Sequence, residues 1–370
     1  MDAAARTVLT GGDPSAKTWE AHHMSVQHKP VSISNDHTAS TAPTQRHRAR
    51  RRFLAAALTA AVGAAMVHPG AEATPPPGCR MRAGTAQTIT VSSVMGTIPV
   101  QVRWARHCGS ASLYVLDGMR ARSDVNGWVA QTDAPAMFAD DDVTLVMPVG
   151  GPGSWYADWV GPTLDQGRPV TYRWETFLTR ELPKTLADYG VSATGNAVVG
   201  LSMSASTAVT LAAHHRDQFV AAAAFSGVLD WHTPDMSAAV RAATWQAGHN
   251  PDELALPGSP EWDHLDPYTA APLLTGATLY IAAGSGVPGP ADQVDSLSAA
   301  GTVLGGIGLE AITAVATRRF KDRLDELGIP AIYSFPPTGT HNWPTWNAEL
   351  GRARPYLLAA IGVEGSTPPP

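Results

Sequence analysis

The sequence predicts an α/β protein with a mostly parallel central sheet and helices on both faces. Between residues 88 and 361, short apolar runs of strand length alternate with longer stretches at helical spacing. This alternation is typical of parallel strands joined by crossover helices. The chain has 370 residues, of which 44% are hydrophobic and 16% charged, a composition that suits one large globular domain or two small ones. Because no repeat and no linker interrupts the pattern, we expect a single domain.

The expected elements follow in order along the chain. Strands are predicted at residues 88–92, 98–104, 111–116, 143–148, 197–201, 219–226, 278–283 and 331–335. Helices are predicted at residues 131–138, 174–189, 203–213, 291–327 and 352–361, and Pro183 could kink the second of these. Residues 230–275 are rich in Pro, Trp and Asp without clear periodicity. We expect this stretch to be an insertion over the site.

One junction between a strand and a helix carries a catalytic motif. The apolar run 197–201 leads into Gly200-Leu201-Ser202-Met203-Ser204, and an Ala-rich helical stretch follows. A serine on such a turn is the nucleophile elbow of the α/β-hydrolase fold, written G-x-S-x-G, although here Ser204 replaces the last glycine. N–H groups after the turn lie at a helix N-terminus, where negative charge is stabilised. We therefore expect an α/β-hydrolase fold with Ser202 as nucleophile.

The serine needs a base to take its proton and an acid to orient that base. In this fold the chain order is serine, acid, histidine. His341 follows the last predicted strand, where the base of the fold belongs. For the acid, Asp292 and Asp295 rank first, because they follow the 278–283 strand, the usual place of the acid. Glu310 lies further on in a helical stretch and ranks second on spacing alone.

The N-terminal region has the pattern of an export signal. Residues 1–45 are polar and without periodicity, and we expect a disordered leader or a start codon placed too early. Residues 46–73 combine a basic run, an apolar run too short to span a membrane, and an A-x-A cleavage site at residues 71–73. The arginine run fits a twin-arginine signal as well as an ordinary one. We expect a secreted or envelope protein whose catalytic domain spans residues 74–365, with a disordered tail at 366–370.

The cysteines and the charge exclude several classes of partner. Cys79 and Cys108 are the two cysteines of the chain, and in an oxidising compartment we expect a disulfide between them that closes the N-terminal hairpin. Two thiols without histidine at ligand spacing do not make a zinc site, so we expect no metal and no other cofactor. A formal net charge of -6 leaves no basic excess for nucleic acid.

Several motifs, in order and at compatible spacing, match one family. They are Leu116-Asp117-Gly118-Met119-Arg120, Asn126-Gly127-Trp128, Met147-Pro148-Val149-Gly150-Gly151, Trp174-Glu175-Thr176-Phe177-Leu178, Gly200-Leu201-Ser202-Met203, Leu309-Glu310 and Gly339-Thr340-His341-Asn342-Trp343. Together they span most of residues 88–360. In them the chain resembles the mycolyltransferases of the mycobacterial antigen 85 complex, which are secreted acyltransferases of α/β-hydrolase fold.

The resemblance implies a role for each matching residue. Ser202 would be the nucleophile, His341 the base and Glu310 the acid, which displaces Asp292 from first rank. The backbone N–H groups of Met119 and Met203 would form the oxyanion hole. The substrate-binding residues would be Asp117, Arg120, Trp343 and Gln131, the last standing where the family usually has Asn.

The resemblance also implies substrates and partners. A mycolyl chain would pass from trehalose monomycolate to a second trehalose monomycolate or to cell-wall arabinan. Residues 177–187 resemble a segment linked to fibronectin binding in the family, although an ordinary packed helix explains them as well. We expect a monomer. The cysteines lie elsewhere than in the mycobacterial enzymes, and the acyl-covering region, residues 231–274, is poorly matched, which leaves the acyl-chain length open.

Two other functions share much of this evidence. A secreted carboxylesterase would use the same triad on water, and only the sugar-site residues argue against it. A non-catalytic carbohydrate or matrix-binding protein could use the same scaffold, but all three triad residues are present here.

Overall fold

The computed structural model describes residues 79–363, except residues 166, 291 and 293–296. These residues belong to one compact unit that extends over residues 71–370. The predicted leader (1–45), the export signal (46–73), the tail (366–370) and Asp295 lie outside the described residues.

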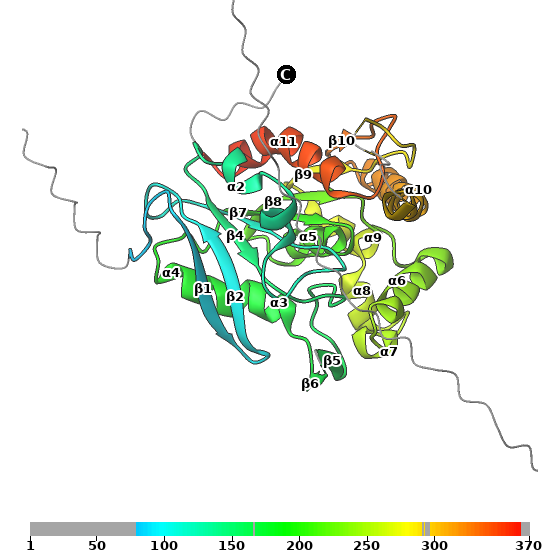
Figure 1. Ribbon diagram of the computed structural model, residues 1–370, viewed down its shortest axis with the longest axis horizontal. Coiled ribbons are helices and arrows are strands. Elements are labelled where there is room, and N and C mark those ends of the chain that lie inside the picture. The colour runs from blue at the N-terminus through cyan, green and yellow to red at the C-terminus, as the bar shows by residue number, and fades with distance from the viewer. Residues whose placement is uncertain (1–78, 166, 291, 293–296, 364–370) are drawn as a thin grey trace, which may run out of the picture. The chain divides into compact units, whose positions relative to one another are not determined.

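An eight-stranded sheet forms the centre of this unit, in the order β1-β2-β4-β3-β7-β8-β9-β10 (Figure 1). The antiparallel edge consists of β1 (Ala86–Ser93) and β2 (Gly96–Arg103), and β2 also pairs antiparallel with β4. The remaining strands run parallel: β3 (Ser112–Val115), β4 (Thr144–Pro148), β7 (Asn196–Leu201), β8 (Phe219–Phe225), β9 (Thr278–Ala282) and β10 (Ile332–Ser334). The α/β fold with a mostly parallel sheet is therefore confirmed.

The central strands are buried on both faces. Along β7, Val198 packs into one hydrophobic cluster while Val199 and Leu201 pack into the other, as the two-residue period of a strand requires. The first cluster lies under α5 (Met203–His214), and the second lies under α1 (Gly127–Gln131), α2 (Ala134–Met137) and α11 (Trp343–Ala360). Strands with no polar face explain why the sequence shows continuous apolar runs here.

The helical stretch predicted at 174–189 has three parts. It begins as α3 (Trp174–Thr176), widens into a π-helical turn, η1 (Phe177–Glu181), and ends as α4 (Leu182–Ala187). Pro183 has no N–H to donate to the carbonyl of Thr179, and the N–H of Leu182 bonds the carbonyl of Phe177 five residues back. The kink expected at Pro183 is a local widening of the helix.

Residues 230–275 are more regular than predicted. They contain α6 (Pro234–Gln246), α7 (Pro251–Leu254), α8 (Pro260–Leu265), α9 (Pro267–Ala270) and the 3₁₀ turn η2 (Ala271–Leu274). Every one of the α-helices has proline at its first position, and Asn250, Ser259 and Asp266 cap the last three with their side chains. Cap followed by proline is a helix-start signal, and α7, α8 and α9 show no periodicity in the sequence because they have only 4, 6 and 4 residues.

Two further differences concern the last helices and a small hairpin. The helix predicted at 352–361 begins at Trp343, since Asn342 caps it by accepting from the N–H of Thr345 at 3.0 Å. The long helix is α10 (Leu297–Glu326). The hairpin of β5 (Thr163–Asp165) and β6 (Arg168–Val170) was not predicted.

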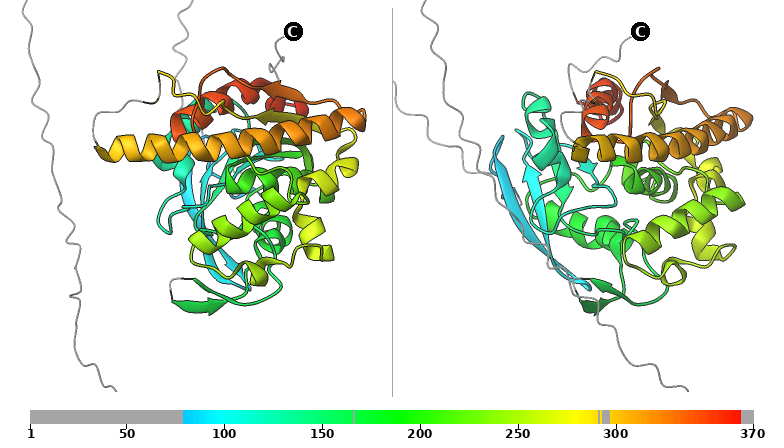
Figure 2. Two further views of the ribbon diagram at one scale, coloured as in Figure 1. Left: turned by 90° about the vertical axis from the view of Figure 1, so that its right-hand side faces the viewer. Right: turned by 45° about the vertical axis from the view of Figure 1, so that its right-hand side comes forward.

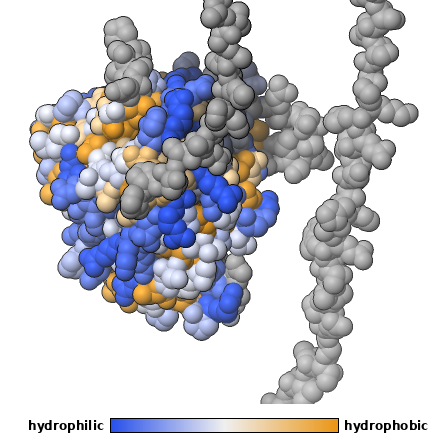
Figure 3. Space-filling model, turned by 90° about the vertical axis from the view of Figure 1, so that its left-hand side faces the viewer, coloured by the Kyte–Doolittle hydropathy of each residue, from blue (hydrophilic) through white to orange (hydrophobic). Residues whose placement is uncertain are grey.

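The disulfide predicted between Cys79 and Cys108 is present, and its two cysteines flank the β1–β2 hairpin. On the side of the molecule where this hairpin lies, hydrophilic residues alternate with small hydrophobic areas (Figure 3). No helix in the described part of the chain is both long enough and apolar enough to cross a membrane.

Candidate active site

Ser202 lies on a sharp turn between β7 and α5. Its backbone has φ 51° and ψ -116°, a strained conformation for a residue with a side chain. Gly200 makes the turn possible, because a Cβ there would overlap the carbonyl group of Ser204. The N–H of Ser202 donates to the carbonyl of Phe225 at 2.8 Å, which anchors the turn to β8. The turn therefore exposes the hydroxyl at the carboxyl end of the sheet.

Ser204, the departure from the G-x-S-x-G motif, fits inside the turn. Its buried hydroxyl accepts from the N–H of Leu201 at 3.0 Å and can donate to the carbonyl of Leu201 or Leu116, at 3.1 and 3.3 Å. A buried hydroxyl with partners costs little, so serine replaces glycine without disturbing the elbow.

A line of hydrogen bonds joins the serine to a histidine and a carboxylate. The Oγ of Ser202 lies 2.8 Å from the Nε2 of His341, and the Nδ1 of His341 lies 2.8 Å from the Oε2 of Glu310. Glu310 is fully buried on α10, and the His341 side chain is only 7% exposed. Elements far apart in the chain thus bring together the three residues that the resemblance implied as a triad.

The buried carboxylate of Glu310 has several other partners. Its Oε1 accepts from the hydroxyl of Ser226 at 2.8 Å and from the N–H of Gly284. Ser226 follows the end of β8 with φ 52°, and its hydroxyl accepts from the indole N–H of Trp346 at 3.1 Å. The Trp346 ring also meets the imidazole of His341 edge-on, with ring centres 5.0 Å apart. Sequence analysis did not single out Ser226 or Trp346; the position of Ser226 at the carboxyl end of a parallel strand was the available signal.

Asp292 does not contact the histidine that it was first expected to orient. Its Oδ1 accepts from the side-chain amide of Asn342 at 2.5 Å and from the hydroxyl of Thr340. These two residues flank His341, and the N–H of His341 donates to the carbonyl of Gly306 on α10 at 3.3 Å. Asp292 and α10 therefore hold the loop that carries the imidazole.

The expected oxyanion donors lie on either side of the nucleophile. Met203 is the first residue of α5, where backbone N–H groups point away from the helix. Met119 follows Gly118, at which an added Cβ would lie 3.9 Å from the Cβ of Ser202. Met203 thus adjoins Ser202 in the chain and Met119 follows a residue packed against it, and the oxyanion role of their N–H groups stays a prediction.

Two of the expected sugar-binding residues are close neighbours. Asp117 is buried two residues after the end of β3, where it accepts from the N–H groups of Gly118 and Gly127 at 2.7 and 2.6 Å. A Cβ at Gly127 would meet both the Asp117 carboxylate and the Trp343 ring. Burial raises the pKa of Asp117, although the two backbone hydrogen bonds act in the opposite direction.

The other two expected sugar-binding residues are on the surface. Arg120 is exposed three residues after Asp117, and Gln131 is exposed at the last position of α1. Tyr156 was not predicted as a site residue. Burial raises the pKa of the Tyr156 hydroxyl, and the nearby Asp117 carboxylate raises it further.

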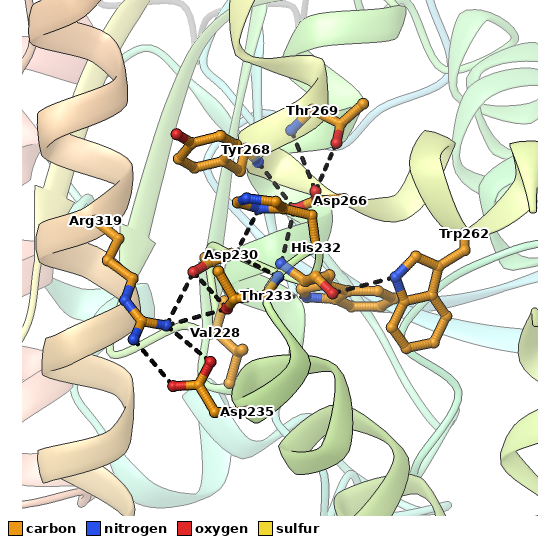
Figure 4. A network of polar contacts seen from close by, with 11 residues as sticks. Val228, Asp230, His232, Thr233, Asp235, Trp262, Asp266, Tyr268, Thr269 and Arg319 are labelled. Carbon is orange, nitrogen blue, oxygen red and sulfur yellow. Dashed lines mark hydrogen bonds and ion pairs between the residues drawn. The ribbon is translucent and has the colours of Figure 1, made fainter. Parts of the chain in front are cut away.

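A polar network fixes α10 to the segment between β8 and α6 (Figure 4). Arg319 on α10 donates to Asp230 at 3.2 Å and to both carboxylate oxygens of Asp235, at 3.1 and 3.0 Å. Asp266 accepts from the N–H groups of Trp231 and Tyr268, at 2.9 and 3.0 Å. Hydrogen bonds therefore hold residues 230–275, the region expected to cover the site, together and fix this region to the helix that carries Glu310.

Comparisons with known proteins place this geometry in a family. Residues 92–357 match the model of the family described as "Putative esterase". The diacylglycerol acyltransferase/mycolyltransferase Ag85B of Mycobacterium intracellulare is 37% identical over 266 residues, which cover 69% of this chain and 77% of the relative. The diacylglycerol acyltransferase/mycolyltransferase Ag85A of Mycobacterium bovis is 37% identical over 70% of this chain and 76% of the relative.

Solved structures agree with these relatives. The crystal structure of Mycobacterium tuberculosis MPT51 has a TM-score of 0.64 and 27% identity, over 75% of this chain and 99% of that protein. The serine hydrolase FphF of Staphylococcus aureus has a TM-score of 0.54 at 14% identity, over 76% and 100% of the two chains, and so supports the fold alone. The chain belongs to the antigen 85 mycolyltransferase family, within the larger group of esterases.

Proposed function

We propose that this chain is a secreted trehalose mycolyltransferase that works through an acyl-enzyme on Ser202. The observation that carries the proposal is the line of hydrogen bonds from Ser202 through His341 to Glu310, on a strained elbow, in a member of the antigen 85 family. This geometry is the general arrangement of an activated serine nucleophile.

In the first half-reaction, Ser202 attacks the ester carbonyl carbon of trehalose monomycolate. His341 takes the hydroxyl proton at Nε2, and Glu310 at Nδ1 stabilises the imidazolium that forms. The N–H groups of Met119 and Met203 bind the oxyanion of the tetrahedral intermediate. The ester C–O bond then breaks, and trehalose leaves with the proton from His341. The mycolyl group remains as an ester on Ser202.

In the second half-reaction, a sugar hydroxyl replaces water as the acceptor. The 6-hydroxyl of a second trehalose monomycolate, or a hydroxyl of cell-wall arabinan, loses its proton to His341 and attacks the acyl carbon. Ser202 leaves and recovers the proton. All steps use side chains and backbone groups of the chain, so the proposal needs no cofactor.

The balance between transfer and hydrolysis depends on how the acceptor binds. Asp117, Arg120, Gln131 and Trp343 are the proposed sugar-binding residues, and the close pair of Asp117 and Trp343 supports a sugar position beside the nucleophile. A carboxylate and an aromatic face can bind the hydroxyl edge and the apolar face of a sugar ring. We further propose that export removes residues 1–73 and that the catalytic domain starts at Thr74.

The decisive experiment supplies the chain from Thr74 with trehalose monomycolate and resolves the products by mass spectrometry. Diacyl-trehalose is expected, and Ser202→Ala should lower turnover by several orders of magnitude. Free mycolic acid as the sole product would mean a carboxylesterase. If wild type shows no turnover, or if Ser202→Ala retains it, the acyl-enzyme proposal fails.

A further inference from the structure

The helix that carries Glu310 has its polar side inside and its apolar side outside. Between residues 303 and 316 of α10, the polar side chains are Glu310 and Thr313, and both are buried. The exposed positions of the same stretch are all apolar or glycine. The large ones are Leu304, Leu309, Ile312 and Val315, which are 70%, 48%, 41% and 45% exposed. A surface helix of a globular protein normally has the opposite arrangement.

These four side chains form what we call the α10 apolar face. The exposed Val287 lies in a neighbouring loop, in which a Cβ at Gly286 would be 3.1 Å from the carbonyl oxygen of Ile307. In the left panel of Figure 2, the N-terminal end of α10 (yellow) extends beyond the neighbouring elements. On the exposed side of this stretch α10 therefore has no charged or polar side chain, where a surface helix is normally polar.

The helix with the α10 apolar face also contacts the proposed triad on its other side. The carbonyl of Gly306, two residues after Leu304, accepts from the N–H of His341 at 3.3 Å. Glu310, on the opposite side of the helix from the apolar face, accepts from the imidazole of His341. A molecule bound to the face would thus lie along the same helix that orders the triad.

We propose that the α10 apolar face inserts into the acyl-chain region of a lipid layer and so brings the active site to its lipid substrate. The choice of a lipid rests on the proposed function, in which the acyl donor is a glycolipid. A helix of this kind binds at an interface by burying its apolar face at the boundary between headgroups and acyl chains. Arg318, exposed one turn after Val315, would lie at the level of the headgroups.

The size of the face argues against a second copy of the chain as its occupant. From residue 304 to residue 315 the helix rises about 16 Å and is about 10 Å wide, so the footprint is on the order of 160 Å². A stable protein interface covers about 800 Å² on each partner. Shallow insertion of one helix into lipid has no such requirement.

The test measures flotation of the chain from Thr74 with vesicles of phosphatidylcholine. This chain contains the whole described unit and lacks the predicted apolar signal, which could itself bind lipid. Leu304→Gln and Ile312→Gln should each lower the partition coefficient about tenfold, and the double variant more, because each substitution removes an apolar side chain from the buried surface. Leu256→Gln, at a leucine that is 55% exposed elsewhere on the surface, is the matched control and should leave flotation unchanged.

Glutamine preserves helix propensity, and melting curves of the single variants check that they fold. The inference is overturned if wild type does not float or if the double variant floats equally well. A dimer in sedimentation velocity that the double variant abolishes, without flotation, would assign the face to a second copy. Ser202→Ala should float like wild type, because flotation does not depend on the nucleophile. An absence of acyl transfer by the wild type would therefore refute the proposed function and leave the flotation result standing.

Discussion

Ser226 is one of the residues that hold the buried carboxylate of Glu310 in place. Its hydroxyl donates to Glu310 at 2.8 Å and accepts from the Trp346 indole at 3.1 Å. The backbone of Ser226 has a positive φ, a conformation that is unfavourable for residues other than glycine. Strain of this kind persists where the surrounding structure imposes it, and we interpret Ser226 as a positioning residue for Glu310.

Ser226→Ala should lower kcat about tenfold, equivalent to about 1.4 kcal/mol of transition-state stabilisation, with little change in KM. The reason is that Glu310 loses one donor and orients His341 less well, while the substrate-binding residues are unaffected. Steady-state kinetics on a short acyl ester measures the two parameters separately.

Ser226→Gly separates the hydroxyl from the backbone strain. Glycine adopts the positive φ without steric cost and also lacks the hydroxyl. Equal losses of kcat in the Ala and Gly variants would show that the hydroxyl is responsible. Full activity of Ser226→Gly would contradict the positioning role.

At the scale of elements, α10 links the Glu310 carboxylate to residues 230–235, in the stretch that was expected to cover the site. It carries Glu310 on its buried side and Arg319 nine residues later, and Arg319 donates to Asp230 and Asp235 (Figure 4). Asp230 is fully buried, whereas the Arg319 side chain is 37% exposed. Water therefore partly screens the contact, and the attraction between the two charges is weaker than in a fully buried ion pair.

Arg319→Met should lower the free energy of unfolding by about 1–2 kcal/mol, because the buried Asp230 loses a charged partner. Backbone amides in the C-terminal half of α10 should also exchange faster with solvent. Thermal unfolding and hydrogen exchange measure these effects. Lys321→Met on the same helix removes a cation that contacts the exposed Asp325 and lies 5.1 Å from the centre of the Tyr333 ring, and it should change both quantities less than Arg319→Met does. Similar behaviour of the two variants would argue against an anchoring role for Arg319.

The order of the elements could be predicted from the sequence where burial on both faces permits only one kind of element. β7 and β8 are buried on both faces, and a continuous apolar run permits little else. The helices α7, α8 and α9 were missed because each is shorter than two turns, so that cap and proline signals specify them and periodicity does not. The start of α11 was placed nine residues late for the same reason, since Asn342 caps it ahead of the periodic stretch.

The candidate site could be predicted in part for a similar reason. Ser202 and His341 follow strands at fixed places in this fold, so local sequence and chain order located both. Glu310 sits within a helix at no diagnostic position, and it was identified through the family resemblance. Ser226 acts through a contact with a residue 84 positions away, which only the folded structure brings together.

At the scale of the whole molecule, Glu175 joins three helices. It lies on α3, and its carboxylate is 2.8 Å from the Nε2 of His215 after α5 and 2.9 Å from the Nε2 of His264 on α8. Burial alone would raise the pKa of Glu175, but the hydrogen bonds from the two imidazoles outweigh it and lower the pKa to about 2. The hydrogen bond with Glu175 in turn raises the pKa of His264. The cluster therefore makes the stability of the molecule depend on pH.

The sign of that dependence follows from linkage. A carboxyl group with a lowered pKa stabilises the fold above its ordinary pKa of 4.5, and this contribution is lost as the pH falls toward 2. A histidine with a raised pKa stabilises the fold below its ordinary value of 6.5, and this contribution is lost as the pH rises through the raised value. Glu175 and His264 thus stabilise the fold together between about pH 4.5 and 6.5.

Glu175→Gln should therefore be most destabilising in this window, by about 1–2 kcal/mol after allowance for the partly exposed imidazoles. The difference in melting temperature from wild type should be largest near pH 5.5 and smaller at pH 8 and at pH 3. Asp124→Asn is the control, because Asp124 pairs with Arg122, which does not titrate in this range. Its effect should be the same at pH 5.5 and pH 8. A difference between wild type and Glu175→Gln that also stays constant from pH 5.5 to pH 8 would mean that the imidazoles do not contribute charge to the cluster.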